Sequence, residues 1–254
     1  MSNKIKVKGR YWSLNRKEDG TIDPKLFGYN YENLELDFNK TAFLVVDVDG
    51  KGYDKDDPIP KPEETTFGTK DLFLIEKKII NEKIKPALDI AREKKFKIVY
   101  VESRDEPYLA DENSEFGKYC KRFWGVSIKE YIGSERGLLQ YSKVVAPRKG
   151  EFVAKKRFYG GFTNTELDYL LKNLGIKNLI SVGFTADICL FFTLYEALLH
   201  NYKVVLLRDA TLAFEPTTEC IKNLTKTKHS VEFIEKFIGH TITTVEFIES
   251  CRNL

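Results

Sequence analysis

Short apolar runs alternate with stretches of helical periodicity along most of this chain, and this alternation strongly restricts its possible folds. The run at residues 41–48, TAFLVVDV, is nearly continuous in apolar and β-branched residues. Similar runs occupy residues 96–101, 178–182 and 203–207, and a weaker one occupies residues 151–156. Continuous rather than alternating apolar residues are typical of strands that are buried on both faces of a sheet.

The stretches between these runs have the spacing of amphipathic helices. Apolar residues at helical intervals predict helices over residues 70–95, 165–173 and 187–200. Pro86 should kink or divide the first helix, and Gly175 should end the second. Strands that alternate with helices in this way pair in parallel through right-handed crossovers. We therefore expect an α/β fold, a three-layer α/β/α sandwich with a mostly parallel sheet.

The same pattern suggests how the chain is divided. Residues 1–40 are polar and rich in turn residues, and we expect them to form an N-terminal extension that packs on the domain. Residues 41–254 should form the domain itself, which is long enough to bury a sizeable core. Within it, residues 102–148 show no regular secondary-structure pattern and are rich in aromatic and charged residues. The tail from residue 219 should carry one or two helices and an edge strand around residues 241–245.

Charge and cysteine usage exclude several classes of protein. The 41 Lys and Arg residues nearly balance the 38 Asp and Glu residues, and the net charge of +3 gives no support for nucleic-acid binding. No run approaches the roughly 18 apolar residues of a membrane span, and the Lys-rich N-terminus lacks the apolar stretch of a secretory signal. The four cysteines are scattered without a C-x-x-C pair, which argues against a disulfide framework or a structural zinc site. We expect a protein of the reducing cytoplasm that has no membrane or nucleic-acid partner.

Three predicted strand ends carry reactive side chains. Asp47 ends the first apolar run, Lys156 ends the weak strand, and Cys189 lies in the first turn of the helix that follows Gly183. Ligands of open parallel sheets bind at the C-terminal ends of the strands, so these three groups should meet. A nearby lysine and a helix N-terminus lower the pKa of a thiol, which predicts an activated cysteine nucleophile. Asp47 would act as general base and acid, and the free N–H groups at the helix start would bind an oxyanion.

Each of these residues also has a purely structural interpretation. An Asp at a strand end is often a turn or cap residue, a Lys there is usually a solvated charge, and a Cys at such a junction is often a small buried hydrophobic residue. The functional interpretation depends on all three lying at the same edge of the sheet.

Three sequence blocks resemble the isochorismatase-like cysteine hydrolase family. They occur in family order and span residues 41–211. TAFLVVDVDG places Asp47 at the catalytic Asp position, KRFYGGFTNTELDYLL places Lys156 at the catalytic Lys position, and NLISVGFTADICLFF places Cys189 at the nucleophile position. One departure is Asp49, which stands where the family often has Gln.

The resemblance implies a mechanism and excludes some relatives. It implies an oxyanion hole made by the N–H groups of Thr185 and Cys189, a cis peptide bond at Phe184–Thr185, and a covalent acyl-enzyme that water hydrolyses with Asp47 as base. Nicotinamidase relatives bind a metal through an Asp and two His, but all three histidines of this chain follow Cys189. We therefore expect no metal and no cofactor. Family members are often dimers or tetramers, so the resemblance also implies a homo-oligomer.

The GGFTNTELD segment, the GKGYD loop at residues 50–54 and the N-terminal extension are most similar to the ureidoacrylate, biuret and N-carbamoyl amidohydrolase branch. Arg104 is the candidate to bind a substrate carboxylate, because Arg can do so through two parallel hydrogen bonds. A surface salt bridge is its alternative role. Aromatic side chains that could line a small pocket, or equally belong to the core, are Tyr108, Trp124, Tyr159 and Phe162.

The combined hypothesis is a cysteine amidohydrolase that cleaves the C–N bond of a small linear amide or ureido compound. Two alternatives remain open at this point. One is a catalytically silent domain that serves in binding or as a scaffold. The other is a hydrolase whose substrate is a cyclic amide or an ester.

Overall fold

The computed structural model describes residues 3–25, 27–103, 112–127 and 141–254. Its strands form one sheet of order β2-β1-β8-β7-β6-β3-β4-β5. The strands are β1 (Lys4–Ser13), β2 (Gly28–Asp37), β3 (Thr41–Val46), β4 (Lys97–Ser103), β5 (Phe152–Lys156), β6 (Asn178–Gly183), β7 (Lys203–Leu207) and β8 (His240–Ile242). The helices are α1 (Lys70–Ile79), α2 (Lys85–Glu93), α3 (Glu115–Trp124), α5 (Leu167–Asn173), α6 (Cys189–Leu199), α7 (Thr218–Asn223), α8 (Thr225–Phe237) and α9 (Thr244–Arg252).

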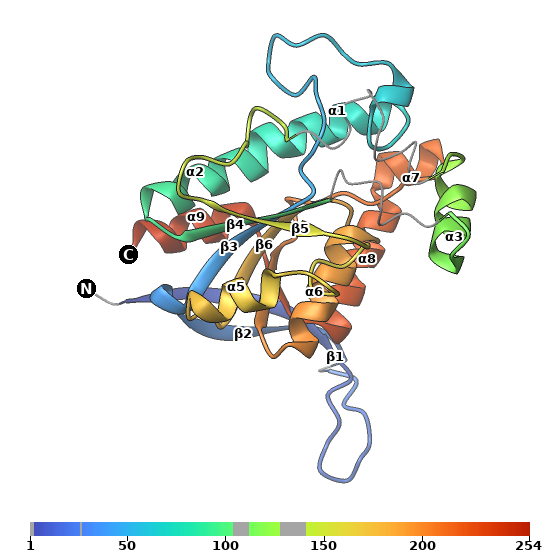
Figure 1. The fold of residues 1–254 in the computed structure, drawn as a ribbon. Coiled ribbons are helices and arrows are strands. Elements are labelled where there is room, and N and C mark those ends of the chain that lie inside the picture. The colour runs from blue at the N-terminus through green and yellow to red at the C-terminus, as the bar shows by residue number, and fades with distance from the viewer. Residues whose placement is uncertain (1–2, 26, 104–111, 128–140) are drawn as a thin grey trace.

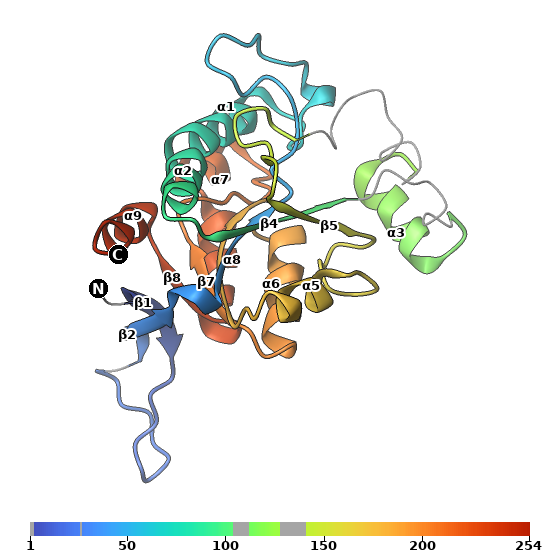
Figure 2. The same cartoon turned by 60° about the vertical axis from the view of Figure 1, so that its left-hand side comes forward.

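Helices cover both faces of this sheet, so the expected three-layer α/β sandwich is confirmed (Figures 1 and 2). The residues of β3 show how the layers are built, because they are all buried and alternate between two cores. Phe43 and Val45 pack with α1, α2 and α9, whereas Leu44 and Val46 pack with α5, α6 and α8. A strand buried on both faces explains the continuous apolar run in the sequence.

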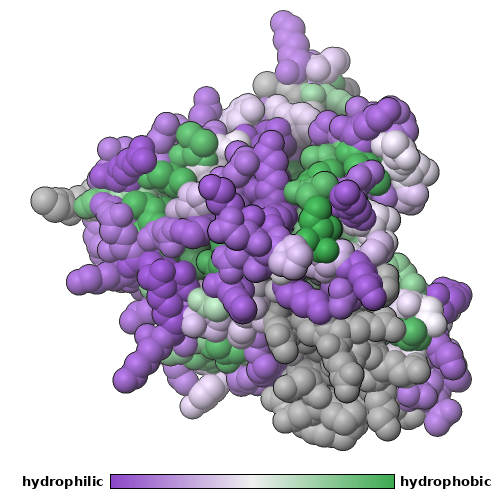
Figure 3. Space-filling view, turned by 90° about the horizontal axis from the view of Figure 1, so that it is seen from above, coloured by the Kyte–Doolittle hydropathy of each residue, from purple (hydrophilic) through white to green (hydrophobic). Residues whose placement is uncertain are grey.

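Six neighbouring strands of the sheet, β8, β7, β6, β3, β4 and β5, all run in parallel, as the alternating pattern predicts. Their C-terminal ends therefore lie at a single edge of the sheet. Seen from above, hydrophilic side chains cover most of the described surface, and apolar side chains gather in a few patches (Figure 3).

The N-terminal residues form more structure than the sequence analysis anticipates. β1 and β2 are an antiparallel hairpin of ten paired positions, from Lys4 with Asp37 to Ser13 with Gly28. Arg10 of β1 pairs with Thr241 of β8, so the hairpin extends the sheet. The strand expected near residues 241–245 is present as β8, but its expected edge position is wrong, because the hairpin covers β8 and makes it an interior strand.

The long helix predicted over residues 70–95 is divided as expected. α1 is followed by a π-helical turn at Ile80–Ile84, and α2 then begins with Pro86 in its first turn. Pro86 lacks an N–H and cannot continue a regular helical hydrogen-bond ladder, which accounts for the change of winding. The middle section also contains a helix that was not predicted, α3, which begins after the capping side chain of Ser114 and ends at Gly125.

Candidate active site

The parallel register brings the three predicted reactive strand ends to the same edge of the sheet. Val46, just before Asp47, is level with Gly183 at the end of β6. Ser103 at the end of β4 is level with Lys156 at the end of β5. Because β6, β3, β4 and β5 are consecutive in the sheet, groups at these ends face a common space.

Lys156 lies at the centre of this arrangement. Its ammonium group is 3.0 Å from Asp47 Oδ2 and 3.6 Å from Cys189 Sγ. The Lys156 side chain is only 3% exposed and that of Asp47 is 12% exposed, so solvent screens this ion pair weakly. The structure thus brings Asp47, Lys156 and Cys189 together.

Two further contacts fix the lysine head group. Lys156 Nζ donates to Ser103 Oγ at 2.9 Å and to the Phe158 carbonyl at 3.2 Å. Sequence analysis missed Ser103, which lies two residues beyond the strand predicted over residues 96–101 and ends β4 in the structure. With these contacts the charge of Lys156 is held between the carboxylate and the sulfur.

Asp47 has an unusual backbone conformation that suits its position. Its φ angle is +44°, in the left-handed region that residues other than glycine seldom adopt, and its N–H donates to the Val101 carbonyl at 2.9 Å. Asp47 Oδ2 is occupied by Lys156, but Oδ1 is buried without a hydrogen-bond partner among the described residues. One carboxylate oxygen is thus available to accept a proton.

The loop that leads to Cys189 depends on Gly183. A Cβ at this position would lie 1.9 Å from the Val46 carbonyl oxygen, and the φ angle is +125°, so only glycine fits. The following Phe184–Thr185 peptide bond is cis, as the family resemblance implies. The close approach of β6 to β3 places the loop directly beside Asp47.

The same loop leaves two backbone donors free. Phe184 N–H donates to Val46, Ala186 N–H donates to Leu212, and the Thr185 carbonyl accepts from Leu190. In contrast, the N–H groups of Thr185 and Cys189 donate to none of the residues that the structure describes. Since Cys189 begins α6, its N–H has no partner within the helix. These are the two donors that the sequence analysis assigns to an oxyanion hole.

Burial changes the electrostatics that the sequence analysis expects for the thiol. Burial raises the pKa of Cys189, the nearby Asp47 carboxylate raises this pKa further, and Lys156 opposes both effects without cancelling them. The expectation of a lowered thiol pKa is therefore wrong, because desolvation outweighs the lysine. Burial by itself would lower the pKa of Lys156, but the Asp47 carboxylate, the Cys189 sulfur and Asp49 together outweigh burial and raise this pKa. The environment of the site therefore disfavours the thiolate form of Cys189 and favours the charged form of Lys156.

A second carboxyl group lies next to this pair. Asp49 is 6% exposed, and its Oδ1 has no hydrogen-bond partner among the described residues. Burial and the charges of Asp47 and Glu102 raise the pKa of Asp49 well above its ordinary value. Glu102 is itself buried and paired with Lys155. Burial and the neighbouring carboxylates therefore disfavour a second negative charge at this site.

The predicted pocket residues are distributed unevenly. Tyr159 lies near the nucleophile, where burial raises the pKa of its phenol and its hydroxyl is 3.4 Å from Cys120 Sγ. Trp124 packs on Phe214 with ring centroids 5.9 Å apart. These aromatic side chains lie on α3 and on loops at the C-terminal edge of the sheet. Arg104 and Tyr108 lie outside the described residues.

Phe162 is not a pocket residue, contrary to the prediction. It is 4% exposed and packs on His200 and Tyr202, with ring centroids 5.0 and 5.8 Å away. His200 follows the C-terminal end of α6, whereas Cys189 begins that helix. Phe162 therefore belongs to the core beneath α5 and α6.

Glu196 of α6 positions the turn that follows Lys156, and sequence analysis missed this role. Its carboxylate accepts from the N–H groups of Phe162 and Thr163, at 2.7 and 3.2 Å, and from the Thr163 hydroxyl. A Cβ on Gly160 would lie 2.4 Å from this carboxylate, which explains the glycine. Glu196 thus joins the Lys156 segment to the helix that carries Cys189.

Neither a membrane nor a metal has an evident site in the described part of the chain. None of the described helices is long and apolar enough to cross a bilayer. The described residues also contain no group of three His, Cys, Asp or Glu side chains that could hold a metal ion. All four cysteines are free thiols.

Comparison with known proteins identifies related chains. The family model described as Isochorismatase domain matches residues 74–235. The ureidoacrylate amidohydrolase RutB of Caulobacter segnis is 28% identical over 182 residues, which is 67% of this chain and 71% of that protein. The RutB of Agrobacterium fabrum is 33% identical over 114 residues, which is 44% of this chain and only 47% of that protein.

Solved structures share the fold at low sequence identity. A cysteine hydrolase from Pseudomonas syringae pv. phaseolicola has a TM-score of 0.63 at 20% identity, covering 85% of this chain and 93% of that chain. N-carbamoylsarcosine amidase from Thermoplasma acidophilum has a TM-score of 0.52 at 22% identity, covering 81% and 96%.

Proposed function

Because the chain belongs to the isochorismatase family, we propose that it is a cysteine amidohydrolase that cleaves the C–N bond of a small linear amide or ureido compound. The observation that carries this proposal is the contact of one buried lysine, Lys156, with both Asp47 and Cys189. A nucleophile, a proton acceptor and a fixed cation in contact meet the requirements of covalent acyl transfer.

In the first half of the proposed reaction, Cys189 Sγ attacks the carbonyl carbon while its proton passes to Asp47. The carbonyl oxygen becomes an oxyanion, which the N–H groups of Thr185 and Cys189 stabilise. The C–N bond then breaks, and Asp47 returns the proton to the departing nitrogen. Ammonia or an amine leaves, and the acyl group remains on sulfur as a thioester.

Water completes the cycle. Asp47 takes a proton from the water molecule as its oxygen attacks the thioester carbon, and the same N–H groups bind the second oxyanion. The C–S bond breaks, the proton passes from Asp47 to the sulfur, and the carboxylic or carbamic acid is released. Each step reuses the free Oδ1 oxygen of Asp47.

Lys156 has two roles in this scheme. It holds a fixed positive charge against the Asp47 carboxylate, and it offsets the negative charge that moves during the reaction from this carboxylate toward the sulfur and the substrate oxygen. Because the Cys189 thiol has a raised pKa, the proton leaves during attack and not in a separate earlier step.

The names of two related proteins support a ureido substrate. Ureidoacrylate amidohydrolase and N-carbamoylsarcosine amidase both act, by name, on compounds with a carbamoyl nitrogen. We extend this substrate class to the present chain, together with a cytoplasmic location suited to its free thiols.

An ammonia-release screen tests the proposal. The panel contains ureidoacrylate, biuret, N-carbamoyl amino acids and simple amides, with cyclic amides and esters assayed for acid release. We expect turnover of at least one linear ureido or amide compound and a loss of at least about 1,000-fold in Cys189→Ala. Cys220→Ala, which removes another free thiol, is the matched control and should keep full activity.

Other results would contradict the proposal in different ways. If Cys189→Ala still releases ammonia, Cys189 is not the nucleophile. If activity is confined to cyclic amides or esters, the proposed substrate class is wrong. A folded protein that turns over none of these compounds favours the silent binding domain.

A further inference from the structure

A large groove lies beside the C-terminal end of β7, apart from the catalytic residues. Its volume is about 700 Å³, which is within the usual size of small-molecule sites. One wall comes from α1 and the π-helical turn, the other from α7 and α8, and the segment 208–211 lies between them. Its lining includes none of Asp47, Thr185, Lys156 and Cys189.

Two buried polar groups in the lining lack partners. Thr211 is 2% exposed, and its Oγ1 has no hydrogen-bond partner among the described residues. The same holds for Nη1 of Arg208, whose other terminal nitrogen contacts Glu246 at 3.5 Å. Buried donors without partners are uncommon in folded proteins. A guanidinium N–H and a hydroxyl, three residues apart and lining one groove, together suit an anionic oxygen ligand.

The charges around the groove favour the same ligand. Six cationic side chains line it: Arg10, Lys78, Lys83, Arg208, Lys222 and Lys228. Carboxylates pair with four of them, as Glu235 with Arg10, Glu82 with Lys78, Asp209 with Lys83 and Glu246 with Arg208. Lys222 and Lys228 have no ion pair within the described ranges of the chain, so the groove keeps an excess of positive charge.

Both carboxylates that line the groove are already occupied, Glu82 by Lys78 and Asp209 by the contacts that follow. Asp209 Oδ1 accepts from the N–H and the hydroxyl of Thr244, at 2.7 and 3.0 Å, and Oδ2 lies 3.2 Å from Lys83. Asp209 is therefore not free to bind a cation. Its contacts hold the segment that presents Arg208 and Thr211.

Apolar side chains supply the remaining walls. Those that line the groove are Ile75 and Ile79 of α1, Ile221 of α7, Leu224, and Val231 of α8. All five side chains belong to the hydrophobic clusters of the molecule or pack against them. An apolar surface next to a cationic end matches a ligand that has an apolar body and an anionic head.

We propose that this groove binds a small organic anion, with a carboxylate or phosphate head at Arg208 and Thr211 and an apolar body along Ile75 and Ile79. The site stands independently of the proposed hydrolase chemistry. It is nevertheless close to the nucleophile loop, because the carbonyls of Ala210 and Leu212, on either side of Thr211, accept from Gly183 and Ala186.

Calorimetric titration of the full chain tests the site. The probes are octanoate and octyl phosphate, with octanol and octylamine as uncharged and cationic counterparts. We expect one octanoate or octyl phosphate per chain, bound at least tenfold more tightly than octanol or octylamine. Thr211→Val replaces the buried hydroxyl with a methyl group and should weaken binding about fivefold to tenfold. Lys222→Gln combined with Lys228→Gln should weaken binding most at low salt.

Controls separate this groove from the active site. Thr41→Val removes another buried hydroxyl, far from the groove, and should leave the affinity for octanoate unchanged. Carboxamidomethylation of Cys189 should also leave it unchanged, whatever the outcome of the hydrolase tests. The proposal is wrong if neither anion binds at millimolar concentration, if octanol binds equally well, if Thr211→Val binds like the wild type, or if alkylated Cys189 abolishes binding.

Discussion

Lys156 Nζ lies 3.0 Å from Asp47 Oδ2, and both side chains are almost fully buried. Such a pair contributes little net stability when intact, but either partner alone is a costly buried charge. The Asp47 carboxylate therefore has a compensating positive charge only while Lys156 is present.

Replacing Lys156 with Met should damage both stability and activity. Asp47 would be left as an uncompensated buried carboxylate, which costs about 3–5 kcal/mol in free energy of unfolding. The variant also lacks the cation that contacts both the Asp47 carboxylate and the Cys189 sulfur. We expect kcat/KM to fall at least about 100-fold, measured with the substrate that the ammonia screen identifies.

The double variant Lys156→Met with Asp47→Asn separates charge from packing. If the stability loss comes from an unpaired charge, urea unfolding should show the double variant to be more stable than Lys156→Met alone. Equal stability of wild type and Lys156→Met would contradict the ion-pair argument.

Replacing Asp47 with Asn should make Cys189 react faster with an alkylating agent, although the same change abolishes hydrolase activity. The Asp47 carboxylate raises the pKa of the Cys189 thiol, so Asp47→Asn should lower that pKa and increase the thiolate fraction. We expect iodoacetamide to modify Cys189 several-fold faster in Asp47→Asn near pH 8, although the variant has lost hydrolase activity. Peptide mass spectrometry distinguishes Cys189 from the other three cysteines.

Lys156→Met should change the alkylation rate of Cys189 in the opposite direction from Asp47→Asn. Lys156 lowers the thiol pKa, so its removal should slow alkylation relative to the wild type. If both variants alkylate at the wild-type rate, the charges at this site do not reach the sulfur and the proposed proton path is wrong.

The parallel core was predictable because each of its strands carries its own signal. Residues 41–46 and 178–183 are buried on both faces, and continuous apolar runs report that directly. Since parallel strands share one C-terminal edge, the sequence also indicates that Asp47, Lys156 and Cys189 meet. Local pattern and topology were sufficient for these features.

The N-terminal hairpin shows where this reasoning fails. Ile5, Val7, Leu34 and Leu36 are buried on alternate positions of β1 and β2, between exposed polar residues. That period of two is a strand signal, but the surrounding polar residues and turns made the segment resemble a surface extension. Its partner strand β8 is only three residues long and gives little signal of its own.

The site details that were missed depend on distant segments and on opposing energies. Glu196 caps the turn after Lys156 only because α6 packs against it, and Phe162 enters the core for the same reason. The thiol pKa reflects desolvation against one lysine, and sequence alone gives the sign of each effect but not their balance.

Gly183 should not tolerate a side chain. In Gly183→Ala the new Cβ would meet the Val46 carbonyl at 1.9 Å and force the end of β6 away from β3. We expect a loss of several kcal/mol in free energy of unfolding, or failure to fold, because the obstacle is backbone. Gly175→Ala is the matched control: its φ angle is also positive, at +70°, but no atom lies within 4 Å of the added Cβ.

Urea unfolding of the two glycine variants measures the difference. Gly175→Ala should lose only about 1 kcal/mol, the cost of a left-handed conformation for a residue with a Cβ. Similar losses in both variants would show that the close approach of β6 and β3 does not constrain position 183.

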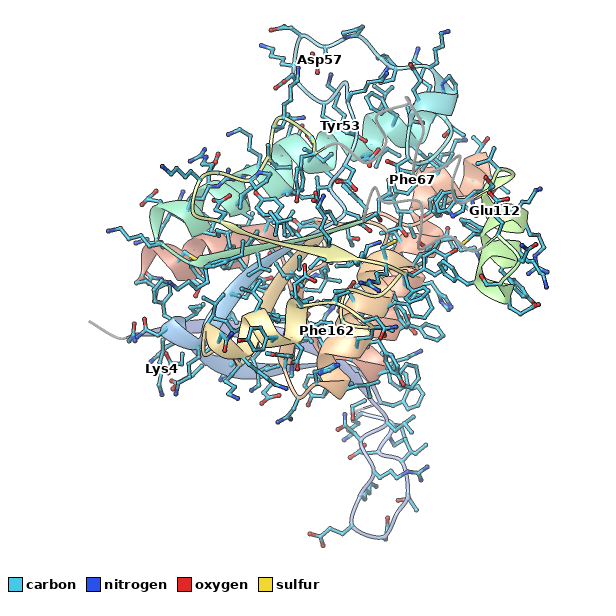
Figure 4. The ribbon with its side chains drawn as sticks, in the orientation of Figure 1. Lys4, Tyr53, Asp57, Phe67, Glu112 and Phe162 are labelled. Carbon is cyan, nitrogen blue, oxygen red and sulfur yellow. The ribbon has the colours of Figure 1, made fainter. Side chains whose placement is uncertain are left out.

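Glu76 should make the protein less stable as pH rises toward the alkaline range. This carboxyl on α1 is completely buried, and burial raises its pKa to about 8. The hydroxyls of Thr66 and Tyr53, the second of which is labelled in Figure 4, oppose this rise only in part. The folded state then holds a proton that the unfolded chain releases near the ordinary Glu value of 4.5. The stabilisation is fully present below that pH and is lost as pH rises through about 8.

Glu76→Gln supplies a neutral side chain of nearly the same shape and should remove this dependence. Between pH 5 and 8 we expect the wild type to lose on the order of 4 kcal/mol relative to Glu76→Gln, measured by urea unfolding at each pH. Glu93→Gln, on the exposed surface of α2, is the control and should follow the wild-type curve. Parallel pH curves for the wild type and Glu76→Gln would mean that Glu76 is already ionised in the folded protein, with a compensating partner beside it.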